Sequence, residues 1–578
     1  ESVVLGALGG SGFYNFEIES PAGTIQDGVF TPSAAVPGTV TITDSFLGLS
    51  TTMSVVVVES LTMDLQRSGF GSSDAELMGA GDLNGDGHPD MILGRYESSV
   101  GTVRSGAVFV YAGIEGGMNP DPVQIFTTSV RRARMGGALA LGDMNGDGVR
   151  DLAIGSFYGD ELHKGRVDIY HGQAEGFFED SPALTLEGRT NWSEFGWTLE
   201  LCDFNGDGFD DLAVGARYDE AKGVAESASN QGRIFIYNGS ATGFASNASQ
   251  VLNGTMLQDS GGWGGHTNLN MPMDTAAGDL DNDGYCDLVA STAYNSDGGG
   301  YDGAVMVFKG QALIDGMSLS AHPVLLIGNQ GPTAWKDGYL GRDITVGDLN
   351  NDSLLEIVIG EYYFSNCANL ESCPGGPLTR NGRTWVLPGG ALSSEVADEW
   401  THLDEVGTYY LGSYSWSMEG WHADIADING DGVNDLLTSG LAAYVEGWFG
   451  GGGSLRVYHG NESGMPDDVV DWEEGGFTQE RVGNRSVVIG DLDGDGITEI
   501  GGFADRADDF GHWAGRLYLY YGDQTKDRVG LNLPGSASDG QFGRELSVIP
   551  DLNGDGLTEL AVSSPFAGYN LYPDFQSW

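Results

Sequence analysis

Short apolar runs alternate along this chain with clusters of glycine, asparagine and aspartate. The clearest pattern is a glycine-bounded segment in which apolar and polar positions alternate: GAVFVYAG from Gly106, GRVDIYHG from Gly165, GRIFIYNG from Gly232, GAVMVFKG from Gly303, GSLRVYHG from Gly453, GRLYLYYG from Gly515 and a looser GRTWVLPG from Gly382. A period of two predicts a β-strand in each copy. Long segments with helical periodicity are hard to find, so we expect an all-β fold.

Each glycine-bounded strand belongs to a longer repeat whose landmarks keep one order. An apolar residue followed by glycine comes first, then an acidic loop, an apolar strand such as LAVGA, the glycine-bounded strand and a weaker fourth strand such as PALTLEG. The apolar-glycine pair is clear at Phe195-Gly196 and Leu340-Gly341, degraded at Met135-Gly136, and not evident near Met418. Units of four antiparallel strands must stack to bury both faces, and radial stacking predicts a β-propeller.

The number of landmarks predicts the number of blades. Eight acidic loops and eight following strands occur, but only seven glycine-bounded strands. The segment ESLTMDLQ at residues 59–66 has the character of a fourth strand without a blade of its own, so we expect it to close the last blade. Residues 59–578 are therefore predicted to form an eight-bladed propeller, with seven blades as the alternative.

Residues 1–58 differ from the repeats because they are strand-like and carry no acidic loop. The turn GGSGFY and the strand end TITDS resemble the later two thirds of a bacterial immunoglobulin-like β-sandwich module. The first strand of such a module is not evident. We expect either that the chain begins inside a longer protein or that a neighbouring segment or subunit donates this strand.

The acidic loops follow one nine-residue pattern, D-x-[ND]-x-D-[GS]-x-x-[DE], whose starting points lie 60 to 79 residues apart. Side-chain oxygens at positions 1, 3 and 5, a main-chain carbonyl at position 7 and a carboxylate at position 9 form the oxygen-rich shell that Ca²⁺ accepts. The expected ligands are Asp82, Asn84, Asp86, His88, Asp90; Asp143, Asn145, Asp147, Val149, Asp151; Asp203, Asn205, Asp207, Phe209, Asp211; Asp279, Asp281, Asp283, Tyr285, Asp287; Asp348, Asn350, Asp352, Leu354, Glu356; Asp427, Asn429, Asp431, Val433, Asp435; Asp491, Asp493, Asp495, Ile497, Glu499; and Asp551, Asn553, Asp555, Leu557, Glu559.

Two other interpretations of the loops fit the sequence less well. An EF-hand needs a glutamate at position 12 and flanking helices, whereas strand-like segments follow these loops. Asx-rich turns without metal would explain one loop, but eight in register favour a cation. The loop at Asp348 is the weakest, because Ser353 replaces the turn glycine and Glu356 replaces the final aspartate.

Net charge excludes one class of partner. The formal charge is −57, from 83 acidic and 26 basic residues, which argues against nucleic acid because phosphates need Lys and Arg. No stretch in this chain approaches the roughly 20 apolar residues of a membrane span. Much of the acidity recurs at the loop positions, which indicates a bound cation.

Cysteine spacing favours an oxidising compartment. Cys367 and Cys373 lie six apart in a polar insertion, a spacing that suits a small disulfide loop. Cys202 and Cys286 each precede an acidic position of neighbouring repeats. The sequence leaves open whether these two are bonded or are buried free thiols.

Together, the Phe-Gly pair, the D-x-N-x-D-G-x-x-D loop and the LAVGA strand resemble the FG-GAP repeats of the integrin α-subunit propeller, over residues 59–578. The resemblance implies up to eight structural Ca²⁺ ions in the loops between the first and second strands of the blades. Propellers of the integrin type have seven blades, and no features for a partner subunit are recognisable here. Integrin-like ligand binding is therefore not carried over.

No catalytic constellation is evident, since the nine histidines are scattered and the H-E-x-x-H and G-x-S-x-G signatures are missing. We expect a secreted or cell-surface bacterial protein with an adhesive or structural role and a protein or glycan ligand, or self-assembly. One alternative is a calcium-dependent carbohydrate-binding or carbohydrate-active protein. Another is the subunit of a surface filament, joined through the immunoglobulin-like segment by strand donation.

Overall fold

The computed structural model describes residues 3–4, 14–19, 23–26, 29–32, 37–44, 49–56, 75–96, 98, 104–114, 117–119, 121–160, 162–174, 176–219, 231–253, 271–292, 303–328, 338–365, 380–390, 401–402, 407–412, 417–441, 451–461, 465–476, 480–491, 497–508, 513–520, 532–534, 542, 546–550 and 558–562. These residues form strands and turns and no helix, as the sequence predicts. Within them, no helix is long and apolar enough to cross a membrane.

The chain divides into two compact units, one holding residues 1–67 and the other most of residues 68–578. The first unit has two antiparallel three-stranded sheets, one of β1 (Val3–Val4), β4 (Val29–Pro32) and β3 (Gly23–Gln26), the other of β2 (Tyr14–Glu19), β5 (Pro37–Asp44) and β6 (Leu49–Val56). Its likeness to an immunoglobulin-like module stays a prediction. So does the boundary at residues 58 and 59, because residues 57–74 lie outside the described ranges.

The second unit is a succession of antiparallel sheets in which each strand pairs with the next. The sheets are β7 (Ala75–Gly81), β8 (Asp90–Arg95), β9 (Ala107–Tyr111), β12 (Gln124–Thr127); β13 (Met135–Gly142), β14 (Asp151–Ser156), β15 (Arg166–Tyr170), β16 (Leu184–Glu187); β17 (Phe195–Cys202), β18 (Asp211–Ala216), β19 (Arg233–Tyr237), β20 (Gln250–Asn253); and β21 (Thr275–Gly278), β22 (Asp287–Thr292), β23 (Ala304–Phe308), β26 (Leu325–Gly328), with β30 (Thr401–His402) added in parallel.

The succession continues with β27 (Leu340–Gly347), β28 (Glu356–Glu361), β29 (Arg383–Leu387), β31 (Thr408–Leu411); β32 (Glu419–Ala426), β33 (Asp435–Gly440), β34 (Ser454–Tyr458), β35 (Trp472–Gly475); β36 (Arg485–Gly490), β37 (Glu499–Ala504), β38 (Arg516–Tyr520), β39 (Asn532–Pro534); and the pair β40 (Leu546–Pro550) and β41 (Thr558–Val562). Two small hairpins lie between the third and fourth strands of their repeats and outside the four-stranded sheets: β10 (Gly113–Ile114) with β11 (Gly117–Met118), and β24 (Gly310–Ile314) with β25 (Met317–Leu319).

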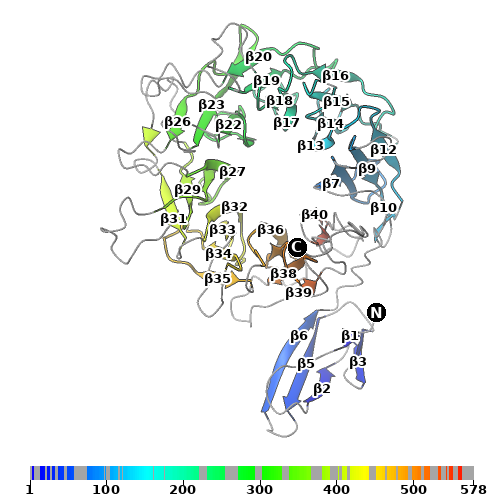
Figure 1. Ribbon diagram of the computed structural model, residues 1–578, viewed down its shortest axis with the longest axis vertical. Helices are drawn as coiled ribbons and strands as arrows, with labels where there is room; N and C mark the ends of the chain where they lie inside the picture. The colour runs from blue at the N-terminus through cyan, green and yellow to red at the C-terminus, as the bar shows by residue number, and fades with distance from the viewer. Residues whose placement is uncertain are drawn as a thin grey trace, which may run out of the picture. The chain divides into compact units, whose positions relative to one another are not determined.

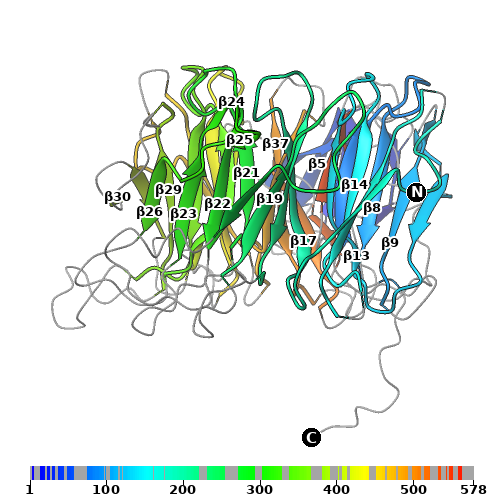
Figure 2. The same cartoon turned by 90° about the horizontal axis from the view of Figure 1, so that it is seen from above.

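These sheets stand around a common axis, with the first strand of each toward the centre and the fourth toward the outside (Figure 1). Seen from the side, the strands run lengthwise along that axis (Figure 2). The innermost strand of the last pair, β40, lies against β7 of the first sheet, so the second unit is a closed β-propeller. The number of blades stays a prediction, because the strand expected at residues 59–66 and much of the last repeat lie outside the described residues.

The glycine-bounded strands are buried because a neighbouring sheet covers each face. Every residue of β9, β23, β29, β34 and β38 is buried. Between the second and third sheets, Val167 and Ile169 of β15 pack with Phe195 and Phe235 of the next sheet. Burial of both faces is the reason that polar positions in these strands are few.

The apolar-glycine pair forms the backbone contact between consecutive sheets. Phe195 is 1 % exposed and forms a β-bridge to Gly165, the first glycine of the preceding third strand. Gly196 has a φ of +86°, and its carbonyl lies 2.5 Å from where a Cβ on Gly155 would stand. A side chain on Gly155 would therefore push the sheets apart, so this strand needs glycine there.

The repeat without an evident pair does have one, formed by Glu419 and Gly420. Gly382 bridges to Glu419, and Gly420 has a φ of +77°. The Glu419 carboxylate takes the place of the phenylalanine ring and is fully buried, with Arg456 Nη1 donating to its Oε2 at 2.6 Å. An internal ion pair thus replaces an apolar contact, which explains why the landmark was missed near Met418.

Candidate metal centre

Six of the predicted loops are described, and each joins the first strand of a sheet to its second, so they lie at one end of the propeller. In each, the position 1 aspartate is held by backbone amides. Asp82 Oδ2 accepts from Gly87 N at 2.8 Å, and its Oδ1 accepts from Gly85 N at 2.7 Å and Asp86 N at 3.2 Å. The position 6 amide donates in the same way at 2.8–2.9 Å in the loops from Asp143, Asp203, Asp279, Asp348 and Asp427.

The position 5 aspartate is fixed by the amide of position 7. His88 N donates to Asp86 Oδ1 at 2.9 Å, and the equivalent bond is 2.8–3.1 Å long in the other five loops. The carboxylates at positions 1 and 5 therefore have defined orientations before any ion is considered. This preorganisation lowers the cost of gathering like charges around a cation.

The position 9 carboxylate is buried and ties three segments together. Asp90 is fully buried, and it accepts from Leu83 N in the loop at 2.7 Å and from Gly113 N, just beyond the third strand, at 2.9 Å. The same pair of donors serves Asp151, Asp287, Glu356 and Asp435. Asp211 accepts from Gly239 N and from the Asn205 amide. Burial raises the pKa of Asp211 and of Asp287 to about 7, against the lowering effect of these hydrogen bonds.

The position 3 side chains of the third and fourth loops supply the test of fit for a cation. Asn205 is 4 % exposed and donates both hydrogen bonds of its amide nitrogen to Asp211, which fixes its Oδ1 on the other side. Asn205 Oδ1 and Asp281 Oδ1 are buried and have no hydrogen-bond partner among the described residues. Buried oxygens without a donor are costly unless a cation or water meets them, so the residues fit Ca²⁺.

The ligands expected in the fourth loop converge most closely. Oxygens of Asp279, Asp281 and Asp283 lie within 4.8 Å of one another, a spacing that one ion can bridge. Lys309 reaches the same place, and its Nζ contacts Asp281 Oδ2 and lies 3.1 Å from Asp283 Oδ2. In the described part of the chain, this is the one loop where three acidic groups meet in this way.

The loop at Asp348 keeps the common geometry despite its two departures. Ser353 has a φ of +71° and donates its amide to Asp348 Oδ2 at 2.9 Å, as the turn glycines do. Glu356 reaches the same two backbone donors as an aspartate, Leu349 N at 2.7 Å and Gly389 N at 3.0 Å. The longer side chain therefore substitutes for the final aspartate, while Ser353 and Asn351, with a φ of +58°, both adopt the left-handed conformation.

Calcium binding stays a prediction for all eight loops, and two of them lie largely outside the described residues. Of the loop from Asp491, the structure describes Asp491, Ile497 and Glu499 but not Asp493 or Asp495. Asp551, Asn553, Asp555 and Leu557 are outside the described residues, and Glu559 is described only as part of β41. The candidate disulfide between Cys367 and Cys373 also lies outside them.

Cys202 and Cys286, whose state the sequence left open, form a disulfide with their Cα atoms 6.0 Å apart. Cys202 ends β17 just before the third loop, and Cys286 is position 8 of the fourth loop. Cys286 N also donates to Asp203 O at 3.1 Å. The bond therefore clips two consecutive loops together.

Position 8 holds further contacts between loops that sequence reasoning missed. Arg150 donates to Ala80 O at 3.0 Å, Asp210 accepts from Asp143 N at 3.1 Å, and Asn434 donates to Asp348 O at 2.6 Å. Each reaches the start of the preceding loop. Their long or polar side chains were the available signal, but position 8 varies in type and so gave no pattern.

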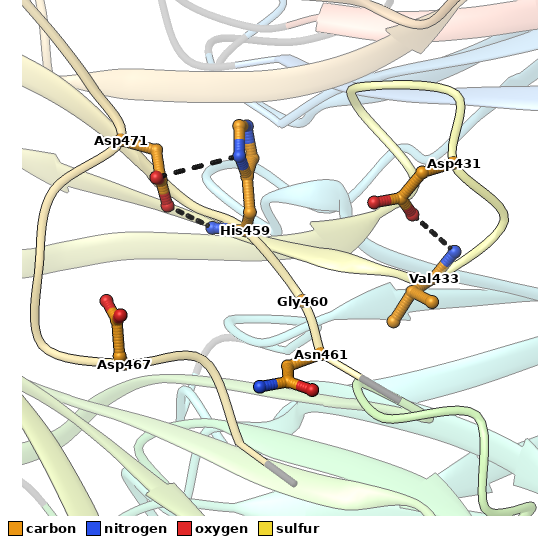
Figure 3. A pocket seen from close by; sticks show the side chains of 7 residues that line it. All are labelled: Asp431, Val433, His459, Gly460, Asn461, Asp467 and Asp471. Carbon is orange, nitrogen blue, oxygen red and sulfur yellow. Dashed lines mark hydrogen bonds and ion pairs between the residues drawn. The ribbon is translucent and has the colours of Figure 1, made fainter. Parts of the chain in front are cut away.

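Beside the sixth loop lies a hollow of about 480 Å³ lined by Asp431, Val433, His459, Gly460, Asn461, Asp467 and Asp471 (Figure 3). His459 N donates to Asp471 Oδ2 at 2.8 Å, and its ring Nδ1 lies 3.7 Å from Asp471 Oδ1. Because Asp431 is itself a loop position, this hollow is the outer edge of the sixth loop.

Comparison with known proteins finds two families of repeats that match segments of the chain. The FG-GAP repeat family matches residues 195–237 and 542–578, and the FG-GAP-like repeat family matches residues 82–154 and 143–214. Human phosphatidylinositol-glycan-specific phospholipase D is 35% identical over 152 residues, 24% of this chain and 18% of that protein.

Integrin α chains are similar over longer segments. Xenopus laevis integrin alpha-5 is 30% identical over 233 residues, 39% of this chain and 20% of the relative, and mouse integrin alpha-3 is 32% identical over 174 residues, 29% and 15%. The matched segments therefore span a fifth or less of these relatives. The chain carries FG-GAP repeats, as its resemblance to integrin α propellers predicted.

Proposed function

We propose that this FG-GAP propeller is an extracellular or cell-surface protein, stabilised by Ca²⁺, that binds or assembles and does not catalyse. The observation that carries the proposal is the repeated loop geometry: backbone amides hold positions 1 and 5 in all six described loops and hold position 9 in the same way in five of them, while Asn205 replaces one of the two amides at Asp211. The integrin relatives support an adhesive or structural role.

Positions 1, 3, 5, 7 and 9 of each loop would hold the ion, up to eight in the chain. A bound Ca²⁺ supplies positive charge to a cluster of carboxylates that repel one another. The chain's own residues do the rest: Asp90 and its equivalents join the loop to the second and third strands, so ordering a loop also orders its sheet. Calcium is therefore proposed as a structural component.

An oxidising location is supported by the Cys202–Cys286 disulfide, since such bonds persist mainly outside the cytosol. The ligand is proposed to be a glycan or a protein. One described feature favours a glycan: the Trp192 ring is 62 % exposed and stacks on His163 with ring centroids 4.3 Å apart. An exposed, supported aromatic ring is a platform on which a sugar can stack.

The test is binding by the purified full chain to glycan arrays and to immobilised surface proteins, with Ca²⁺ and after chelation. Calcium-dependent binding without turnover of the bound glycan supports the proposal. Trp192→Ala should weaken glycan binding, whereas Trp513→Ala, at another exposed tryptophan, is the control. Hydrolysis or another chemical change of a bound polysaccharide would establish a carbohydrate-active protein and overturn the proposal.

A further inference from the structure

We infer that the loop from Asp279 carries its own cation, the Lys309 ammonium, and is consequently the weakest calcium site among the described loops. This inference rests on the proposed calcium binding and concerns which loops hold the ion. It runs against the sequence, because aspartate at position 3 makes this loop one of the two in the chain with four acidic residues at the ligand positions.

The geometry places the ammonium between the ligands. Lys309 Nζ contacts Asp281 Oδ2 and lies 3.1 Å from Asp283 Oδ2, so it engages the side chains of positions 3 and 5 together. The Lys309 side chain is 21 % exposed and that of Asp281 is 14 % exposed, so solvent screens the pair only in part. An ion at this loop must first displace the ammonium from both carboxylates.

The lysine backbone is fixed, so this contact does not depend on a mobile segment. Lys309 N donates to Ser320 Oγ at 3.1 Å, and Lys309 O accepts from Ser320 N at 2.8 Å. The next residue, Gly310, donates its amide to Asp287 Oδ1 at 2.8 Å. The hydrogen bond from Gly310 to Asp287, at position 9, therefore holds the neighbouring Lys309 beside the loop.

The same register in the other described repeats carries no lysine. The residue before the glycine that binds position 9 is Ala112, His171, Asn238, Pro388 or His459. Asn238 belongs to the third repeat, whose Asn205 Oδ1 is buried without a partner among the described residues. The third and fourth loops are thus a matched pair, joined by the Cys202–Cys286 disulfide, that differ in their resident cation.

The inference can be tested through the number of Ca²⁺ ions that the chain binds and through the calcium affinity of the loop from Asp279. Removing the ammonium with Lys309→Met keeps the length of the side chain and leaves four carboxylates without a counter-charge, so calcium affinity at this loop should rise about tenfold or more. Native mass spectrometry of the full chain across a calcium titration should show one more ion bound to K309M than to the unaltered chain at the same low calcium concentration.

Two further variants locate the change. Asp279→Ala in the K309M background should remove the additional ion, because it takes away the position 1 carboxylate that every loop of the chain carries. Asn238→Lys should install an ammonium beside the third loop and reduce the count there by one. Circular dichroism and gel filtration establish that each variant is folded before ions are counted.

The possible outcomes separate this inference from the proposed function. Equal calcium counts and affinities for K309M and the unaltered chain, with other ions bound, would overturn this inference and leave the proposed function standing. An unaltered chain that binds no calcium at all would overturn the proposed function. A K309M chain that gains an ion which D279A does not remove would place the change outside this loop and also overturn the inference.

Discussion

At the scale of single residues, the loop from Asp348 shows what the turn glycine contributes. Ser353 holds a φ of +71° that an L-residue adopts at a cost of about 1 kcal/mol, yet it makes the same bond to Asp348 as glycine does elsewhere. Ser353→Gly should therefore raise the free energy of unfolding by roughly 0.5–1 kcal/mol. Urea unfolding in calcium measures it.

The matched control is the reverse change in another loop. Gly208 has a φ of +87°, and a Cβ there would meet nothing within 4 Å, so Gly208→Ser adds conformational strain and no clash. It should lower the free energy of unfolding by about 1 kcal/mol. If both variants shift stability in the same direction, the strain at Ser353 is not what distinguishes the loop.

A second residue-scale effect belongs to Asp274, just before β21. Burial, together with the nearby Asp343 carboxylate, raises the pKa of Asp274 to about 7, although the Ile344 amide donates to its Oδ2 at 2.9 Å and Arg342 lies nearby. A raised carboxyl pKa means that the folded state holds a proton that the unfolded state has released. Its stabilising effect is present at low pH and is lost as pH rises through about 7.

We therefore expect Asp274 to add a slope of up to about 1.4 kcal/mol per pH unit, with stability falling as pH rises from about 4 to 7. Asp274→Asn should flatten that part of the curve of unfolding free energy against pH. The comparison is Asp168→Asn, a buried aspartate that is paired with Arg166. An unchanged slope in the Asp274→Asn chain would show that this carboxyl is ionised throughout.

At the scale of elements, the sixth repeat has a charged residue, Glu419, at the position where other repeats have the apolar residue of the apolar-glycine pair. Glu419 stands where Phe195 stands in the third repeat, and Arg456 of β34 stands across from it, fully buried. Arg456 also donates to Glu473 Oε1 at 2.7 Å. Without Glu419, the Arg456 guanidinium keeps Glu473, whose side chain is 23 % exposed, as its remaining ion partner, and removing one member of a buried pair costs more than the pair itself is worth.

The variant Glu419→Leu should accordingly destabilise the propeller by roughly 3–5 kcal/mol, because Arg456 stays buried and charged. The double variant Glu419→Leu with Arg456→Met should recover most of this loss, since an apolar pair is what other repeats use. Thermal unfolding of the two single variants and the double variant completes the cycle. Additive losses would mean that the two side chains do not act as a pair.

Much of the fold could be predicted from the sequence because the elements repeat. The strands β15, β19 and β38 lie within the predicted glycine-bounded segments, and the all-β propeller and its FG-GAP repeats are confirmed. The repeat pattern could not predict interactions that occur in one repeat alone. The Glu419–Arg456 pair and Lys309 each break the repeat, and the disulfide needed the spatial closeness of residues 84 apart in sequence.

At the scale of the whole molecule, the net charge of −57 predicts that bound cations stabilise the compact state. Each calcium site filled at a concentration 100 times its Kd adds about 2.7 kcal/mol to the free energy of unfolding. With several loops filled, chelation should lower the Tm by roughly 10–20 °C, given the entropy of unfolding of a chain of this size. Differential scanning calorimetry in calcium and in chelator measures the difference.

A salt titration tests whether repulsion among the carboxylates causes the loss of Tm on chelation. If mutual repulsion among the carboxylates destabilises the calcium-free propeller, then 1 M NaCl, which shortens the Debye length to about 3 Å, should restore part of the lost Tm. Salt should change the calcium-loaded chain less, because each bound Ca²⁺ already offsets two negative charges of its loop. A Tm that chelation leaves unchanged would mean that the backbone amides on Asp82, Asp86 and Asp90 hold the first loop, and their equivalents the others, without an ion. The acidic loops would then be turns in which hydrogen bonds do the work proposed for calcium.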